Sequence, residues 1–255
     1  MAQLYKSFIS FCGEVSTLLP ALALLGEAAY KKKYNISFDP QVIKKDKIPI
    51  LLLHGKGYNQ IEWKFGRKYL EIEKYGSVFS LDYDGLASNT DGKTIEDYAV
   101  VVGNKILEIQ KLTGMNEIVL IGHSLGGLVA TAYAEDLAEK QNIIVKHVIT
   151  IATPFHEPPL VHYFKNWSIL FKQMMEPYLI KLREKAINSI NKKIRSYHTI
   201  DSVADFEVPS PCGSIDCKIQ NHMAYTWFGH NVLVVHPTVW NYISDLLDKF
   251  VYVKL

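Results

Sequence analysis

The residues best able to do chemistry in this sequence are a serine held between glycines and the acids and histidines that follow it. Ser124 stands in a Gly-x-Ser-x-Gly motif, after the apolar run 118–121 and before small and apolar residues at helical spacing. A buried strand, this motif and a helix together predict a nucleophile elbow, which holds the serine hydroxyl above a sheet in a strained backbone conformation. The turn is tight enough to require glycine on both sides of it. The predicted elbow residues around the serine are Gly122, His123 and Gly126.

A serine hydroxyl becomes a good nucleophile only when a base takes its proton and an acid orients that base. On a doubly wound sheet these partners lie on loops at the carboxyl ends of later strands, in the chain order serine, acid, histidine. Ser124, Asp205 and His230 follow that order, and each comes after a predicted strand. We therefore predict that these three residues act together.

Other residues compete for these roles. Asp201 is nearer to its predicted strand and is expected to be a structural or capping group. His222 lies in a predicted loop before the last strand, and His236 is expected inside or at the start of the final helix. His54 and His123 precede the expected order and are predicted to hydrogen-bond to the groups of the site. The alternative for the whole motif is an ordinary strand-to-helix turn with a capping serine.

An oxyanion that develops on the substrate needs two backbone N–H donors aimed at one point. Leu125, the residue after the serine, is predicted to supply one of them. The loop 54–57, which follows the first predicted strand, is placed to supply the other from Lys56. Read alone, this Gly-x-Gly loop is explained equally well as a plain glycine turn.

Strands and helices alternate along most of the chain. Short apolar or β-branched runs predict strands, and segments with helical periodicity predict the helices between them. This alternation predicts an α/β fold with a doubly wound, mostly parallel sheet. The predicted strands are 50–53, 77–83, 118–121, 145–151, 195–200 and 224–228, and the predicted helices are 63–73, 94–112, 127–138 and 237–250.

The alternation is interrupted between residues 155 and 191, where about forty residues contain no strand pattern. Aromatic residues, Met and Leu recur there near helical spacing. One interpretation is an inserted helical cap whose apolar face lines an acyl pocket, with Trp167, Phe171 and Met174 in contact with substrate. The alternative is an ordinary core face, because stripes of Met and aromatic residues usually are core.

Composition limits the classes of function. The 255 residues suit one large domain at 45–255, and the net charge of +2 leaves no electrostatic footprint for nucleic acid. The three cysteines, Cys12, Cys212 and Cys217, favour reduced thiols in a cytosolic chain, while a disulfide between the last two stays open. The sequence shows no spacing typical of a metal site, and we expect neither a metal nor a cofactor.

The first 44 residues are predicted to form an additional helical segment. Residues 8–30 are largely apolar, but Glu14, Pro20 and Glu27 interrupt them, which disfavours a spanning helix or a cleaved signal peptide. We expect one or two helices that pack on the domain or lie at a membrane surface. Peripheral membrane contact through this segment or the cap is the only membrane association that we predict.

The chain resembles the α/β-hydrolase lipases, and is most similar to small class 2 bacterial lipases and to esterases of the GPI inositol-deacylase type. The resemblance covers about residues 48–250. It rests on His-Gly after the first strand, Gly-His-Ser-Leu-Gly-Gly at the elbow, Ser-Val-Ala-Asp-x-x-Val at 202–208, and Gly-His-x-x-Leu before the closing helix. It implies the α/β-hydrolase fold, with Ser124 as nucleophile, Asp205 as acid, His230 as base, and Lys56 and Leu125 as oxyanion donors. The N-terminal segment and the insertion depart from the smallest members.

These features predict a serine hydrolase of carboxylic esters, with lipid or long-chain acyl esters favoured by the aromatic, Met-rich insertion. An acyl thioesterase or an acyltransferase would use the same residues, and the sequence does not separate them. A relative that binds a lipid or a protein partner without turnover is the alternative of another class. The intact order of serine, acid and histidine argues against that alternative.

Overall fold

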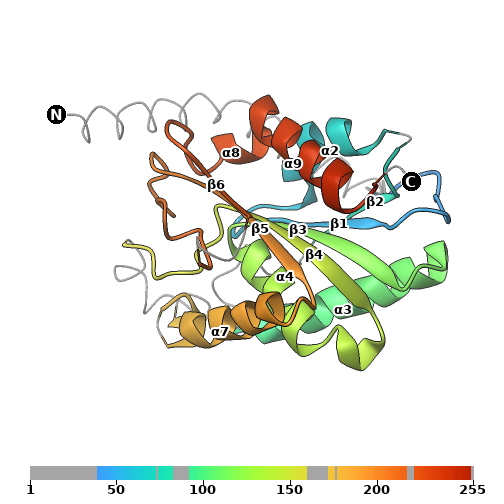
Figure 1. Ribbon diagram of the computed structural model, residues 1–255, viewed down its shortest axis with the longest axis horizontal. Helices are drawn as coiled ribbons and strands as arrows, with labels where there is room; N and C mark the ends of the chain where they lie inside the picture. Colours follow the sequence, from blue (N-terminus) through green and yellow to red (C-terminus); the bar gives the residue numbers. More distant parts are fainter. Residues whose placement is uncertain are drawn as a thin grey trace.

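The computed structural model describes residues 39–72, 74–82, 92–159, 172–175, 177–216 and 221–253, which form a parallel sheet between two layers of helices (Figure 1). The described sheet has six strands in the order β2-β1-β3-β4-β5-β6, and every neighbouring pair is parallel. The predicted doubly wound α/β architecture is therefore confirmed. The strands are β1 (Ile50–Leu53), β2 (Val78–Leu81), β3 (Glu117–His123), β4 (Ile144–Ile151), β5 (Ser196–Ser202) and β6 (Asn221–Tyr225).

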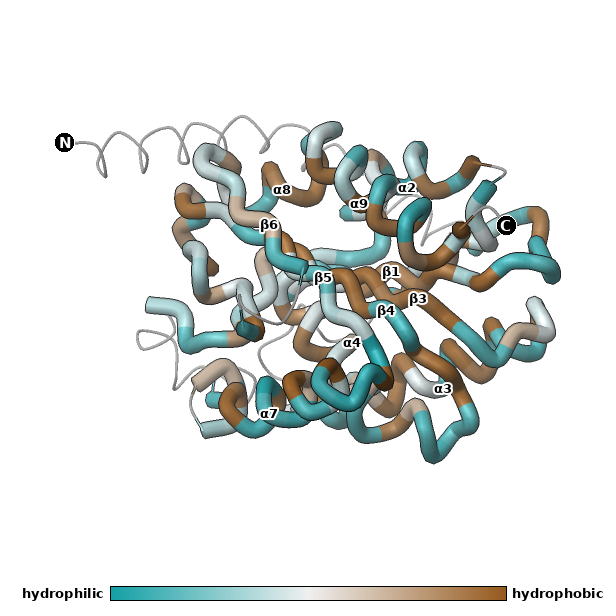
Figure 2. The backbone as a smooth tube through the Cα atoms, in the orientation of Figure 1, coloured by the Kyte–Doolittle hydropathy of each residue, from teal (hydrophilic) through white to brown (hydrophobic). Residues whose placement is uncertain are grey.

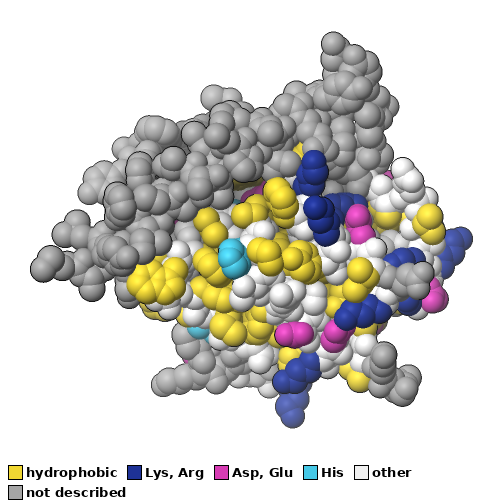
Figure 3. All heavy atoms as spheres, turned by 90° about the horizontal axis from the view of Figure 1, so that it is seen from above, with side chains coloured by type: hydrophobic (Ala, Val, Ile, Leu, Met, Phe, Trp, Pro, Cys, Tyr) yellow, Lys and Arg dark blue, Asp and Glu magenta, His cyan; other side chains and the backbone are white. Residues whose placement is uncertain are grey.

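The helices divide between the two faces of the sheet (Figure 1). One face is covered by α3 (Ile95–Thr113), α4 (Leu125–Asp136) and α7 (Tyr178–Asn191), with the short η2 (Glu139–Gln141) after α4. The other is covered by η1 (Gln60–Trp63), α2 (Lys64–Leu70), α8 (Val232–Val235) and α9 (Pro237–Phe250). On the side of α8 and α9, hydrophobic side chains gather around a histidine at the surface (Figure 3).

Local signals in the sequence fix the ends of the longer helices. The Thr94 side chain accepts a hydrogen bond from the Asp97 N–H while the Asp97 carboxylate accepts one from the Thr94 N–H, a capping box that starts α3. Gly114 ends this helix in the left-handed region, at a φ of 75°. Pro237 occupies the first position of α9, where its missing N–H has no consequence.

The core lies on both faces of the sheet because side chains alternate along each buried strand. Ile50 and Leu52 of β1 pack in a cluster with Trp63 and Trp240, whereas Leu51 and Leu53 belong to the cluster under α3 and α4. The backbone coloured by hydropathy shows apolar residues concentrated along the central strands (Figure 2). Such a sheet is rigid and presents the carboxyl ends of its strands as a platform for loops.

The predicted cap over 155–191 is not confirmed. Its final part, α7, packs against α4 in the helix layer, and Leu179, Leu182 and Ala186 lie in the core. This part therefore serves as the ordinary crossover helix between β4 and β5. Residues 160–171, like residues 1–38 of the predicted N-terminal segment, lie outside the described residues.

The last strand differs from the sequence-based expectation of 224–228. β6 begins at Asn221, so that His222 lies within the strand and not in a loop before it. The polar residues at its start concealed this edge strand, whose side chains are only partly buried. Among the described residues, no helix is long and apolar enough to cross a membrane.

Candidate active site

Ser124 lies between β3 and α4 in a strained backbone conformation. Its φ of 50° and ψ of −122° are unusual for a residue with a side chain, and such strain persists only when the surroundings enforce it. The Ser124 N–H donates to the Ile151 carbonyl at 2.8 Å, which ties the turn to the end of β4. The side chain remains half-buried, whereas the residues on both sides of it are buried. This geometry is that of a nucleophile elbow.

The two glycines of the motif are required by close backbone contacts. A Cβ added at Gly122 would lie 2.5 Å from the backbone nitrogen of Gly127, inside the turn itself. One added at Gly126 would lie 2.1 Å from the carbonyl oxygen of Leu53, so this glycine lets α4 approach the end of β1. The clash expected within the turn therefore holds at Gly122, while Gly126 is required by a different neighbour.

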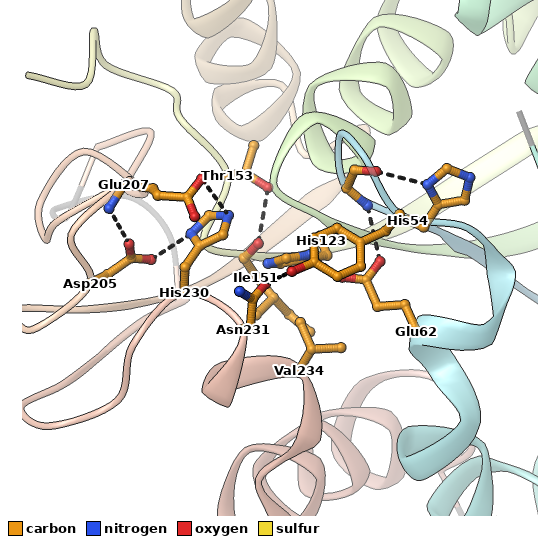
Figure 4. Close-up of polar contacts among 12 residues, drawn as sticks. His54, Glu62, His123, Ile151, Thr153, Asp205, Glu207, His230, Asn231 and Val234 are labelled. Atoms are coloured by element: carbon orange, nitrogen blue, oxygen red, sulfur yellow. Dashed lines mark hydrogen bonds and ion pairs between the residues drawn. The ribbon is translucent and has the colours of Figure 1, made fainter. Parts of the chain in front are cut away.

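Asp205 and His230 meet directly on the loops that follow β5 and β6 (Figure 4). The Asp205 Oδ2 atom lies 2.8 Å from His230 Nδ1, and both side chains are buried. The backbone N–H groups of Glu207 and Val208 each donate to Asp205 Oδ1 at 2.8 Å. Burial alone would raise the pKa of Asp205, but His230 and these N–H donors together lower it. The carboxylate therefore stays ionised and holds a proton on His230 Nδ1.

His230 also lies close to the elbow. The centroid of its ring is 4.7 Å from that of His123, the residue before the serine. Its Nε2 atom lies 4.0 Å from an oxygen of Glu207, an exposed carboxylate that the sequence did not single out. The structure thus brings the predicted base to the neighbourhood of Ser124, while the catalytic roles of these residues remain predictions.

The competing acid and histidines occupy other places. Asp201 is fully buried within β5, and its Oδ1 atom lies 3.5 Å from His222 Nε2. His222 Nδ1 is 2.8 Å from the hydroxyl of Thr199 on the neighbouring strand. His236 Nδ1 accepts from the Thr238 N–H at 3.2 Å and so caps α9. The distances therefore join His230 to Asp205 and His222 to Asp201.

The loop after β1 forms a tight turn next to the elbow. The Tyr58 N–H donates to the Gly55 carbonyl at 3.3 Å, and Gly57 has a φ of 78°, as the third position of a type II turn requires. A Cβ added at Gly55 would lie only 3.2 Å from Ser124 Cβ. Lys56 is half-buried, and burial lowers the pKa of its ammonium group to about 8. Leu125 is fully buried at the start of α4.

Sequence reasoning missed a buried carboxylate behind this loop. Glu62, in η1, accepts a hydrogen bond from the Gly55 N–H at 3.0 Å and forms an ion pair with His123 Nδ1. His54 Nδ1 donates to the Gly55 carbonyl at 2.8 Å, and His54 Nε2 lies 3.7 Å from an oxygen of Asp82. Both histidines thus make polar contacts around this loop, and their predicted support of the site stays a prediction. The only sequence signal for Glu62 is its place between Ile61 and Trp63, which are buried with it.

A hydrogen bond joins the loop after β1 to the loop after β6. The Tyr58 hydroxyl donates to Asn231 Oδ1 at 2.6 Å, which links the loop after β1 to the residue that follows His230. The Tyr58 ring also meets the His123 ring edge to face, with centroids 6.3 Å apart. The loops of β1, β3 and β6 are therefore connected through polar and ring contacts (Figure 4).

The predicted substrate residues are placed differently. Met174 is 6% exposed and belongs to the hydrophobic cluster under α3 and α4, which favours the core interpretation for this residue. Trp167 and Phe171 lie outside the described residues, as does Cys217 of the possible disulfide. Within the described part of the chain, no group of three or more His, Cys, Asp or Glu side chains could hold a metal ion.

Comparison with known proteins gives the same fold and one family. The family model described as "PGAP1-like alpha/beta domain" matches residues 44–246. A (lyso)-N-acylphosphatidylethanolamine lipase from Mus musculus is 28% identical over 124 residues, which are 47% of this chain and 34% of that protein. The chain therefore spans about a third of the length of this curated relative.

Solved structures with the same fold include bacterial lipases. The mature form of the lipase BlEst2 from Bacillus licheniformis superposes with a TM-score of 0.64 at 16% identity, over 82% of this chain and 96% of that one. A lipase-esterase related protein from Clostridium acetobutylicum gives a TM-score of 0.56 at 18% identity, over 84% of this chain and 100% of that one. At these identities the likeness shows the α/β-hydrolase fold.

Proposed function

We propose that this chain, which belongs to the PGAP1-like alpha/beta domain family, is a serine hydrolase that cleaves carboxylic esters. The observation that carries the proposal is the half-buried Ser124, held at a φ of 50° on an elbow, beside a buried pair of Asp205 and His230. The names of its relatives, which are lipases and esterases, support the same class of reaction.

In the proposed mechanism the Ser124 hydroxyl attacks the ester carbonyl carbon while His230 Nε2 accepts its proton. Asp205 keeps the other ring nitrogen, Nδ1, protonated and stabilises the imidazolium that forms. The proton then passes to the leaving alkoxide, and the alcohol departs. A water molecule that gives its proton to His230 next attacks the acyl-enzyme, which releases the acid and restores Ser124.

The oxyanion of each tetrahedral intermediate would be stabilised by two backbone donors. The Leu125 N–H lies at the start of α4, where the positive end of the helix also favours negative charge. The Lys56 N–H belongs to the turn that approaches the serine from the other side. Such fixed donors commonly contribute about 10²- to 10³-fold to the rate.

We further propose apolar acyl or lipid esters as the substrate class. Three large hydrophobic side chains are exposed on the loops that follow β5 and β6, namely Val203 (46%), Phe206 (64%) and Trp227 (48%). These loops also carry Asp205 and His230, so an acyl chain or a lipid surface at this rim would cover apolar groups close to the reacting atoms. Contact with a membrane surface through this rim or the N-terminal segment belongs to the same proposal.

Turnover of p-nitrophenyl esters of graded chain length tests the proposal. The wild type is expected to hydrolyse them with a preference for longer acyl chains, and Ser124→Ala is expected to be inactive but folded. Activity that survives Ser124→Ala would remove the serine mechanism. A preference for acetate over longer chains would remove the apolar substrate class but leave ester hydrolysis in place.

A further inference from the structure

The carboxylate of Glu62 is buried directly behind the proposed oxyanion loop. Its side chain is 5% exposed and meets two groups, the Gly55 N–H and the His123 ring. Burial alone would raise the pKa of Glu62, but His123, His54 and the Gly55 N–H lower it below its usual range. Glu62 is therefore an ionised acceptor, and the Gly55 N–H is one of the donors that satisfy it.

The carbonyl group of Gly55 is held as firmly as its N–H. It accepts from His54 Nδ1 at 2.8 Å and from the Tyr58 N–H at 3.3 Å. This carbonyl and the Lys56 N–H belong to one planar, trans peptide group, so they point in opposite directions. The contacts that fix the Gly55 carbonyl therefore also fix the direction of the Lys56 N–H.

The same network ties the loop to the nucleophile. A Cβ added at Gly55 would lie 2.9 Å from His123 Nδ1 and 3.2 Å from Ser124 Cβ, so the loop rests against the elbow. Glu62 contacts both partners, with one oxygen on the Gly55 N–H and the other on His123. A rotation of either peptide group at Gly55 would leave buried polar groups without their partners, which is unfavourable.

We propose that Glu62 and His54 are positioning residues that keep the Lys56 N–H aimed at the oxyanion before substrate binds. This inference rests on the proposed ester hydrolysis at Ser124. Glu62 and His54 act through the peptide groups of Gly55 and touch neither the substrate nor the reacting atoms. They therefore stabilise the tetrahedral intermediate much more than the bound ester, because only the intermediate carries the full oxyanion.

The kinetics of Glu62→Gln test this proposal. The variant keeps the size of the side chain but removes the charge that pairs with His123. We expect kcat per active site to fall about 10- to 100-fold, with KM within about threefold of the wild type. The dissociation constant of a trifluoromethyl ketone, which forms a tetrahedral adduct on the serine, is expected to rise by about the same factor as kcat/KM falls.

Glu71→Gln is the matched control, because Glu71 is an exposed carboxylate in an ion pair with Arg67. It is expected to leave all three constants unchanged. Active sites are counted by titration with a fluorophosphonate, so that partial unfolding does not lower the measured kcat. A wild-type kcat and ketone affinity in Glu62→Gln would overturn the inference, and so would equal losses in the control.

Two variants of His54 test the positioning role if Glu62→Gln does not fold. In His54→Asn the amide nitrogen takes the place of Nδ1 and can still donate to the Gly55 carbonyl, whereas in His54→Gln it takes the place of Nε2. We expect His54→Asn to retain at least tenfold more kcat than His54→Gln. Equal kcat values in the two variants would overturn the inference.

Ser124→Ala separates this inference from the function on which it depends. If Ser124→Ala abolishes turnover while the Glu62 and His54 variants behave like the wild type, ester hydrolysis stands and the positioning role is wrong. If Ser124→Ala retains turnover, the proposed function itself is wrong.

Discussion

Two pairs of aspartate and histidine lie on neighbouring parts of this molecule, and only one of them suits catalysis. Asp205 and His230 are 2.8 Å apart, whereas Asp201 and His222 are 3.5 Å apart. The first pair lies on loops beyond the ends of β5 and β6, and the second lies within those strands. The side chains of a strand point to one face of the sheet or the other. Side chains on the loop beyond the strand can instead reach the elbow.

The surroundings of the two carboxylates shift their pKa values in opposite directions. Burial acts on both, but in Asp205 the contacts with His230 and two backbone N–H groups lower the pKa. In Asp201 burial prevails over the more distant His222, and the pKa of its carboxyl group is raised. The comparison indicates that contacts to the charged form, and not burial, distinguish the proposed catalytic acid.

The largest difference between the pairs is expected from their histidines. His230→Ala should lower kcat about 10⁴-fold or more, because no base would then take the Ser124 proton. His222→Ala, the matched change in the other pair, should lower it less than about tenfold, since His222 contacts Thr199 and Asp201 but belongs to a strand. Initial rates on a p-nitrophenyl ester measure both, with circular dichroism as the control for folding. Similar losses of kcat in the two variants would contradict the assignment of His230 as the base.

The next largest difference in kcat is expected between the variants of the two aspartates. Asp205→Asn is expected to lower kcat about 10³- to 10⁴-fold, because an amide at this place favours the wrong tautomer of His230. The kcat of Asp201→Asn is expected to stay within about tenfold of the wild-type value. The same ester assay checks this prediction. A greater loss in Asp201→Asn would show that the acid is misassigned.

The two substitutions, Asp205→Asn and Asp201→Asn, should change the stability of the fold in opposite directions and with different pH dependence. The lowered pKa of Asp205 means that its ionised form stabilises the fold above about pH 4, and this contribution is lost as the pH falls through the folded-state value. The raised pKa of Asp201 has the opposite effect: its contribution is most favourable in acid and is lost as the pH rises through the raised value.

Thermal unfolding measures this difference. At pH 7 we expect Asp205→Asn to lower Tm and Asp201→Asn to raise it, by a few degrees at about 2–4 °C per kcal/mol. Both differences should shrink as the pH is lowered toward 3. If Asp201→Asn lowers Tm at pH 7 as much as Asp205→Asn does, the assignment of the two pKa directions is wrong.

The smallest effect is expected at Glu207, the second carboxylate near His230. Glu207 is 4.0 Å from His230 Nε2, but its side chain is 61% exposed, and exposed ion pairs contribute little. Glu207→Gln should therefore change kcat and KM by less than about threefold. A change near that of Asp205→Asn, in the same assay, would make Glu207 a partner of the base.

The sequence was sufficient for five of the six strands of the described sheet, for the start of α3, for both ends of α9 and for the strand-turn-helix around Ser124. These depend on local patterns: apolar runs, a capping box, a proline at the first helical position, and glycines where the backbone leaves no space. Each is decided by residues within one or two turns of the chain.

The sequence was not sufficient for Glu62 or for the contact of Tyr58 with Asn231. No local pattern marks Glu62 as a residue of the site, because its partner His123 is about sixty residues away in the sequence. Tyr58 and Asn231 are farther apart still, and only the packed sheet brings their loops together. The Met174 prediction shows the reverse problem, since an apolar stripe does not reveal whether it faces a pocket or the core.

The proposed mechanism requires that Ser124 is a nucleophile activated by His230. Peptide mapping by mass spectrometry after treatment with a fluorophosphonate tests this activation. We predict one adduct on Ser124 in the folded wild type and labelling at least about a hundredfold slower in His230→Ala. A wild type that takes up no label on Ser124, or a His230→Ala variant that is labelled as fast, would contradict the claim.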